Sequence, residues 1–164
     1  MTTSPKKTLR VLGFMTGTSL DAVDMAVIET DGHDILSFGP AGEMKLDGET
    51  RAIIEDAIED AFDWERDEEE PDSFEDARMA VADAHLAAAL GFMAVNGVRS
   101  SALDLVGVHG QTVLHEAPTP DAPGRTVQLI DAVSVAEGLS VPVAYDFRST
   151  DVAAGGQGAP LAPV

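Results

Sequence analysis

Apolar residues come in short runs over the first 46 positions, and then alternate with stretches of helical spacing. Residues 8–17 and 23–30 are two such runs, joined by a polar turn, and a third covers residues 34–46. Short apolar runs bounded by glycine and aspartate predict strands. Strands first, followed by strands and helices in alternation, indicate an α/β fold with a mixed sheet.

Two helices are expected between these strands and the rest of the chain. Residues 54–62 carry apolar side chains on one helical face, at Ile54, Ala57, Ile58, Ala61 and Phe62. After an acidic loop, Ser73 is the predicted N-cap of a second helix that ends at Asn96-Gly97. Its many alanines predict close packing against a sheet.

The remaining chain alternates again. Strands are expected at residues 103–108, 126–130 and 141–145, with a short helix at 132–137. In α/β sheets, ligands bind beyond the carboxyl ends of strands, and three polar turns of this sequence lie at such points. The segment from residue 153 to 164 carries glycines and prolines and predicts no element that closes a fold.

Composition sets the broad class. The 164 residues, 45 % hydrophobic, suit one globular domain, and the lack of cysteine excludes disulfide and thiolate chemistry. No uninterrupted apolar run approaches the roughly 18 residues of a membrane span, and the N-terminus lacks the apolar core of a secretory signal. A cytoplasmic protein is expected.

The formal net charge is −19. Such a chain repels phosphate backbones and anionic lipid, so neither nucleic acid nor membrane is an expected partner. Much of the excess lies in residues 55–76, around residues 64–72, and is interpreted as a solvated loop between two helices. A metal site is the alternative there, but the run lacks the glycine-spaced turn of a calcium loop.

Three polar segments are candidates for chemistry. The turn Gly17-Thr18-Ser19-Leu20-Asp21 offers backbone amides and two hydroxyls that suit a phosphate, and Asp21 or Asp24 is a candidate for holding Mg²⁺ through water. A plain hairpin turn is the alternative. The turn is no Walker A loop, because no Gly-Lys-Ser/Thr follows it.

The second segment is His109-Gly110-Gln111-Thr112, whose side chains offer the directional hydrogen bonds that a sugar needs. A histidine that only caps a strand end is an equal alternative. Zinc is a poor one, because His109 and His115 do not have the spacing of a zinc helix.

The third segment runs from Asp146-Phe147-Arg148 through Asp151 to the glycine-rich residues 155–160. An aspartate directly after a strand suits a general base whose ionised form a nearby arginine supports. An ion pair followed by a flexible tail is the alternative.

The sequence motifs in these segments resemble those of one family, the anhydro-N-acetylmuramic acid kinases. The resemblance rests on residues 15–24 (Met15-Thr16-Gly17 to Asp24), 109–115 and 146–161, the last including Gly155-Gly156-Gln157-Gly158-Ala159-Pro160-Leu161, in the family's order. It implies the N-terminal lobe of an actin-like ATPase of the hexokinase and Hsp70 class. It further implies ATP- and Mg²⁺-dependent conversion of 1,6-anhydro-N-acetylmuramic acid to the 6-phosphate in cell-wall recycling, and possible homodimers of the full-length enzyme.

The resemblance also assigns roles. The residues expected to line the ATP phosphates are Gly17, Thr18, Ser19, Leu20, Asp21, Ala22, Val23 and Asp24. His109, Gln111 and Thr112 are expected to face the sugar. Asp146 is the expected base, with Asp151 its rival, and Arg148 would orient the site or meet phosphate.

Three departures from the family pattern stand out. Position 16 is Thr where Ser is usual, and position 22 is Ala where Gly is usual, which adds a Cβ beside the phosphate turn. Family members also extend beyond the position of residue 164 into a second lobe that binds adenosine. We therefore expect residues 1–164 to form one lobe that lacks turnover alone, or else a non-catalytic binding module that kept the fold.

Overall fold

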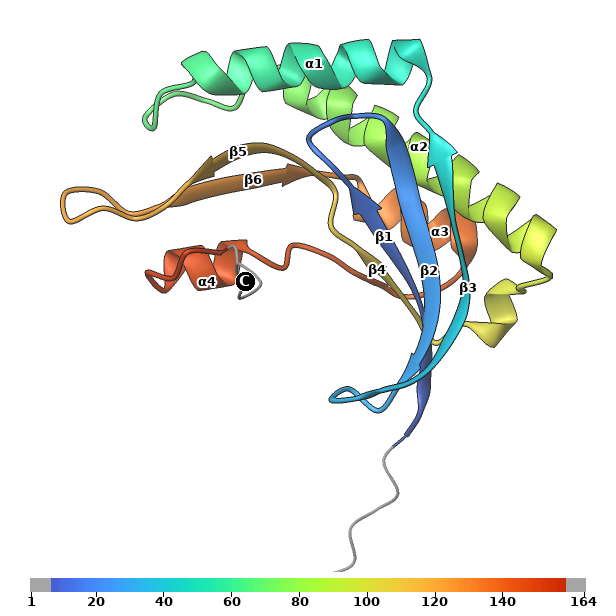
Figure 1. Cartoon of the computed structure of the whole chain (residues 1–164). Coiled ribbons are helices and arrows are strands. Elements are labelled where there is room, and N and C mark those ends of the chain that lie inside the picture. Colours follow the sequence, from blue (N-terminus) through green and yellow to red (C-terminus); the bar gives the residue numbers. More distant parts are fainter. Residues whose placement is uncertain (1–6, 159–164) are drawn as a thin grey trace, which may run out of the picture.

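The computed structural model describes residues 7–158 (Figure 1). The main sheet contains β1 (Leu9–Thr16), β2 (Ala22–Thr30), β3 (Ile35–Lys45), β4 (Leu105–Val108) and β7 (Val143–Ala144). The helices are α1 (Gly48–Asp63), α2 (Ser73–Asn96), α3 (Ala132–Leu139) and α4 (Ser149–Ala153), with a 3-10 turn at Ser100–Ala102. Strands β5 (Gln111–Glu116) and β6 (Arg125–Leu129) form a separate hairpin.

The strand order of the main sheet is β3-β2-β1-β4-β7. Strands β1 to β3 pair antiparallel, whereas β1, β4 and β7 run parallel. The mixed sheet flanked by helices confirms the predicted α/β class. Because β1, β4 and β7 are parallel, the turns that follow them come to the same edge of the sheet.

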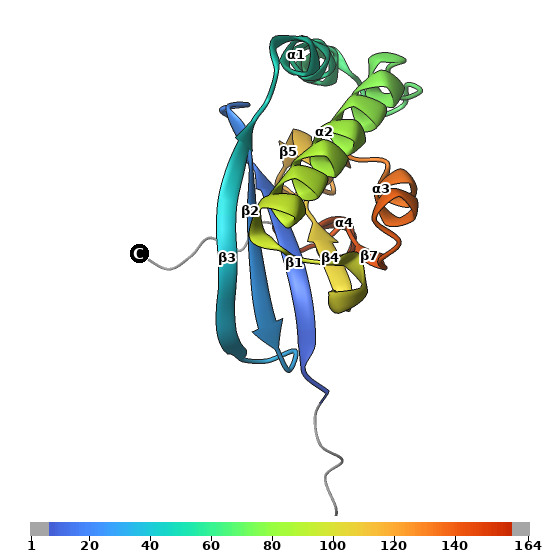
Figure 2. The ribbon, with the colours of Figure 1, turned by 90° about the vertical axis from the view of Figure 1, so that its right-hand side faces the viewer.

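The core lies between this sheet and helices α2 and α3 (Figure 2). Alternate residues of β1 and β2 point into it, among them Leu12, Phe14, Val23 and Met25. Alanines on the buried face of α2, such as Ala88 and Ala89, are small enough to let the helix approach the strands closely.

Helix α2 is longer and more apolar than the sequence pattern predicted. An 18-residue window of it has a mean hydropathy of 1.4, enough in length and composition to cross a membrane. Asp83 and His85 interrupt its apolar residues, so the sequence contains no continuous apolar run there. Of this window, 39 % is buried inside the protein, and the buried residues of α2 pack in the core against the sheet.

Most predicted elements are present, with boundaries shifted by a few residues, and three details were wrong. Ser73 is not the N-cap of α2 but its first residue, and its hydroxyl donates to Asp60 at 2.5 Å. Gln111 and Thr112 begin strand β5 rather than forming only a turn. The segment after Arg148, one interpretation of which was a flexible tail, contains α4. The predicted motif residues Ala159, Pro160 and Leu161 lie outside the described residues.

Candidate active site

The β1–β2 turn has the exposed hydroxyls expected of a phosphate turn. Thr18 and Ser19 are exposed, and the amide of Leu20 donates to the Gly17 carbonyl at 3.2 Å. Leu20 takes a left-handed conformation, with φ 51°, while its side chain is anchored in the core at 4 % exposure. The buried leucine therefore fixes the backbone of a turn whose tip faces solvent.

Asp21 stabilises the end of this turn, where the chain enters β2, through hydrogen bonds. Its Oδ1 accepts hydrogen bonds from the Ser19 hydroxyl at 2.7 Å and from the Ala22 amide at 3.0 Å. The Ser19 hydrogen bond is the main cause that lowers the pKa of the Asp21 carboxyl below its usual value. Asp21 is thus an exposed, ionised carboxylate at the turn, which is the type of group that Mg²⁺ prefers.

Not every residue of the segment predicted to bind phosphate has a side chain that a ligand can reach. Leu20, Ala22 and Val23 are buried, so they can reach a ligand only through their backbone, whereas Asp24 is exposed on β2. Ala22 is absent from the described residues with positive φ. Its Cβ, the departure from the family pattern, is therefore accommodated in β2 without backbone strain.

A buried hydrogen bond connects this turn to the second segment. The Thr16 hydroxyl donates to the Gly110 carbonyl at 3.0 Å. Gly110 has φ 74°, and a Cβ there would lie 2.8 Å from the Leu129 carbonyl oxygen. Only glycine fits at this position, because both the backbone angle and the space exclude a side chain.

His109 is held between two partners. Its Nε2 lies 2.8 Å from the Nε of Arg148, and its Nδ1 lies 2.9 Å from the Gly110 carbonyl oxygen. A guanidinium can only donate, so Nε2 accepts and Nδ1 carries the proton that it donates to Gly110. The contact with Arg148 thus selects the neutral Nδ1–H tautomer of His109.

Gln111 and Thr112 differ in accessibility. Gln111 is 1 % exposed, its Nε2 donates to the Thr112 carbonyl at 3.3 Å, and its Oε1 has no hydrogen-bond partner. Thr112 is half-buried, and its hydroxyl lies 3.4 Å from the Nε2 of Gln128 on the paired strand β6. Of the two, Thr112 has the side chain that a ligand reaches more easily.

The two candidate bases are both exposed and both hydrogen-bonded to backbone amides. Asp146 has φ 54°, and its Oδ1 accepts from the Ser149 amide at 3.2 Å. Asp151 lies in α4, and its Oδ2 accepts from the Gly158 amide at 2.7 Å. A Cβ at Gly156 would overlap the Asp151 carboxylate, so the glycine-rich segment wraps closely around that side chain.

The three predicted segments meet through these contacts. Thr16 joins the first to the second, and Arg148 joins the third to the second through His109. Arg148 also donates to the Gly158 carbonyl at 3.1 Å, which ties down the glycine-rich segment. A phosphate-type turn, polar hydrogen-bonding groups and two carboxylates therefore share one edge of the sheet.

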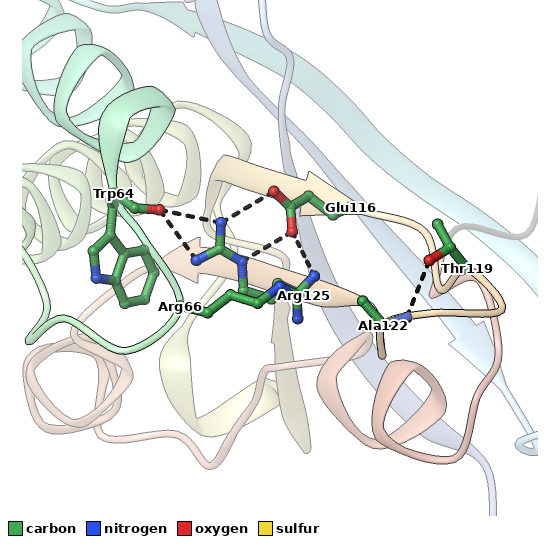
Figure 3. Close-up of polar contacts among 6 residues, drawn as sticks. All are labelled: Trp64, Arg66, Glu116, Thr119, Ala122 and Arg125. Atoms are coloured by element: carbon green, nitrogen blue, oxygen red, sulfur yellow. Dashed lines mark hydrogen bonds and ion pairs between the residues drawn. The ribbon is translucent and has the colours of Figure 1, made fainter.

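Sequence reasoning missed the polar cluster that holds the β5–β6 hairpin (Figure 3). Glu116 accepts from Arg66 at 2.8 Å and from the Nε and Nη2 of Arg125 at 2.9 and 3.0 Å. Arg125 also donates to the Trp64 carbonyl at 3.2 Å and lies over the Trp64 ring, 5.2 Å from its centroid. The hydrogen bond from Arg125 is the main cause that lowers the pKa of Glu116. These contacts attach the hairpin, and with it Thr112, to the end of α1.

The strand order and the polar strand ends are consistent with the N-terminal lobe of an actin-like ATPase. Residues 9–164 match the family model described as anhydro-N-acetylmuramic acid kinase. The chain belongs to this family.

Relatives named anhydro-N-acetylmuramic acid kinase are close in sequence. The chain is 62 % identical to one from Phenylobacterium zucineum and 58 % identical to one from Caulobacter vibrioides, in each case over 95 % of this chain and 42 % of the relative. Identity to one from Methylobacterium nodulans is 37 %, over 95 % of this chain and 43 % of that relative. The chain therefore spans about two-fifths of the length of these relatives.

Proposed function

We propose that this chain is the N-terminal lobe of a two-lobe kinase that uses ATP to convert 1,6-anhydro-N-acetylmuramic acid to N-acetylmuramic acid 6-phosphate. The observation that carries the proposal is the meeting of the three motif segments through Thr16–Gly110 and His109–Arg148. Family membership and the names of the relatives support the same activity. A C-terminal lobe, as long as the rest of those relatives, would bind adenosine.

The phosphates of ATP would bind at the β1–β2 turn, where Thr18 and Ser19 are exposed and backbone amides can donate to phosphate oxygens. Asp21 fits a role in holding Mg²⁺ because it is exposed and ionised. Within residues 7–158 no three His, Asp or Glu side chains gather as a metal cage. Most ligands of the ion would therefore be phosphate oxygens and water, and the bound ion would offset phosphate charge.

The sugar would bind at the segment from His109 to Thr112. The Thr112 hydroxyl is the best-supported direct contact, since both ring nitrogens of His109 already have partners and Gln111 is buried. His109 would then contribute chiefly by fixing the Gly110 peptide and the Arg148 side chain. The unpaired Oε1 of Gln111 would gain a partner if the side chain turned toward the sugar.

For the chemical step we assign the base to Asp146, with Asp151 as the rival. The base would take a proton from a water molecule, and the water oxygen would attack the anomeric carbon. The bond from that carbon to O6 breaks, and O6 takes the γ-phosphoryl group from ATP, which leaves as ADP. A carboxylate with a fixed orientation suits this role, and each aspartate is oriented by a backbone amide.

A coupled kinase assay tests the proposal. The substrates are ATP, Mg²⁺ and 1,6-anhydro-N-acetylmuramic acid, and the proteins are this chain and a fusion of residues 1–164 to the C-terminal part of the Phenylobacterium relative. We expect sugar 6-phosphate from the fusion, none from the chain alone, and none from the fusion with Asp146→Asn. A folded fusion that binds the sugar without turnover would refute the kinase assignment and favour a non-catalytic binding module.

A further inference from the structure

Arg51 of α1 is a basic residue without an acidic partner. Ion pairs hold four other basic side chains of the described part of the chain, those of Lys7, Arg66, Arg78 and Arg125. The side chain of Arg51 forms no ion pair or hydrogen bond within residues 7–158, and its Nε is buried without a partner. Acidic residues outnumber basic ones by 29 to 10, so a carboxylate is the partner that this sequence supplies most readily. The lack of one at Arg51 therefore requires a physical explanation.

The position of Arg51 in the helix is unfavourable for a cation. Arg51 is the fourth residue of α1, and the N-terminal end of a helix carries a partial positive charge. It also lies three and seven residues before Ile54 and Ile58, on the stripe that packs into the core. Asp47 and Glu55 are each four residues away, a spacing that suits an ion pair, but neither pairs with Arg51 in the described structure. Because a partly buried charge without a partner costs stability, an anion that Arg51 binds is the better explanation for its place.

The start of α1 lies beside the β1–β2 turn. The Leu46 amide, one residue before the N-cap of α1, donates to the Asp21 carbonyl at 3.1 Å. In Figures 1 and 2 the turn and α1 lie at the same end of the sheet. The hydrogen bond from Ser19 is the largest cause that lowers the pKa of the Asp21 carboxyl, and the positive charge of Arg51 is a further, smaller one. Arg51 therefore acts on this turn through space, without an ion pair to Asp21.

A guanidinium beside this turn is complementary to a phosphate group. Arginine only donates hydrogen bonds, and its planar fork of N–H groups fits two oxygens of one phosphate. The turn adds the exposed hydroxyls of Thr18 and Ser19, and the Asp21 carboxylate is suited to Mg²⁺. During phosphoryl transfer the negative charge spreads over the oxygens of the transferred group, where a positive side chain stabilises it. The surroundings of Arg51 thus fit the phosphate that reacts.

We propose that Arg51 binds the terminal phosphate of the nucleotide at the β1–β2 turn, and that this role explains a cation at the start of α1. The assignment deepens the proposed function and rests on it. The guanidinium donates to oxygens of the transferred group, while Asp21 holds Mg²⁺ from the side of the turn. A chain with a net charge of −19 repels a nucleotide, so a cation at this point also favours its binding.

Nucleotide binding to the fusion described above tests the assignment without turnover. Titration calorimetry with Mg²⁺ compares the non-hydrolysable imido analogue of ATP with ADP, which lacks the terminal phosphate. In Arg51→Gln the preference for the ATP analogue over ADP should fall roughly tenfold or more, and Arg51→Lys should restore part of it. Arg99→Gln is the matched control, because it removes the same charge from an exposed side chain before β4. Since β1 and β4 are parallel, Arg99 lies at the opposite edge of the sheet from the turn after β1.

Unfolding of the 164-residue chain gives a second measurement. If Arg51 is present for a ligand, Arg51→Met should raise the urea midpoint by roughly 0.2–0.5 M, because it removes a cation from the positive end of the helix dipole. A lower midpoint would make Arg51 a structural residue and overturn the proposal.

The remaining outcomes separate this assignment from the proposed function. An unchanged preference for the ATP analogue in Arg51→Gln overturns the assignment, and sugar 6-phosphate formed by that variant at the native rate does so while leaving the kinase function intact. Weaker sugar binding with unchanged nucleotide binding also overturns it, because the guanidinium would then bind the carboxylate of the sugar. A fusion in which Arg51→Gln removes the preference but which never phosphorylates the sugar would sink the proposed function and leave the phosphate contact standing.

Discussion

Replacing Gly110 by alanine tests whether the second motif is fixed where the three segments meet. The Gly110 carbonyl accepts from Thr16 and from His109, so this peptide cannot rotate without breaking both hydrogen bonds. The residue has φ 74°, and a Cβ would lie 2.8 Å from the Leu129 carbonyl oxygen and 3.2 Å from Ile130. Alanine would strain the backbone angle and push against the neighbouring chain at once.

The two costs can be added. A left-handed backbone costs a residue with a Cβ about 1–2 kcal/mol. Overpacking against a part of the structure that cannot yield costs about 1–3 kcal/mol. Gly110→Ala should therefore lower the free energy of unfolding by about 2–5 kcal/mol, a large share of the roughly 5–15 kcal/mol that holds a domain together.

Urea unfolding followed by circular dichroism measures this cost. With an m-value of about 1–3 kcal/mol per molar urea, the midpoint should fall by roughly 1–3 M. Gly91→Ala is the matched control, because Gly91 lies in α2 with nothing within 4 Å of its Cβ position. There alanine should stabilise by about 0.5–1 kcal/mol. If the midpoint for Gly110→Ala rises or stays unchanged, the steric and conformational argument is refuted.

Further predictions concern pH and catalysis. Burial lowers the pKa of His85 to about 4, against 6.5 unfolded, so the unfolded chain binds more protons between these values. Stability should fall as pH drops through that window, and His85→Gln should flatten the loss in pH-dependent urea unfolding. The pKa of Glu116 is lowered chiefly by its hydrogen bond from Arg125, so its stabilisation is present above an unfolded pKa near 4.5 and is lost as pH falls further. Glu116→Gln should therefore lose less stability than the native chain on acidification below about pH 4.5, measured in the same way. In the fusion, Asp146→Asn should lower kcat by about 10²–10⁴-fold, and Asp151→Asn by clearly less, if Asp146 is the base. The reverse order in the coupled assay would exchange the two roles.

Much of the order of strands and helices could be predicted because β1, β2, α1 and α2 each carry a periodic pattern of apolar residues. Residues of β1 and β2 alternate between core and outside, and α2 has alanines at helical spacing before a left-handed Gly97. Strand β5 was missed because its pairing with β6 contains a register shift between Thr112 and Leu114, which breaks the two-residue period. Helix α4 has only five residues, too few for a periodic signal.

Of the site, the three segments could be identified from sequence but their contacts could not. Arg148 and His109 are 39 positions apart, and no local sequence pattern predicts the hydrogen bond between their side chains. The burial of Gln111 likewise depends on how the hairpin packs under α1, a tertiary effect. The Glu116–Arg125–Trp64 cluster joins three parts of the chain, so its residues looked like ordinary surface charges and an ordinary aromatic in the sequence.

Backbone strain gives an argument for the site that does not use motifs or relatives. Among residues 7–158, the non-glycine residues with positive φ are Leu20, Ser140 and Asp146. Ser140 ends helix α3, a common place for this conformation, but Leu20 lies in the β1–β2 turn predicted to bind phosphate and Asp146 is the predicted base. Such strain persists only where the surroundings enforce it, and here the core holds Leu20 while the Ser149 amide holds Asp146. The strain therefore lies at the two places where the proposed kinase would need a fixed turn and a fixed carboxylate.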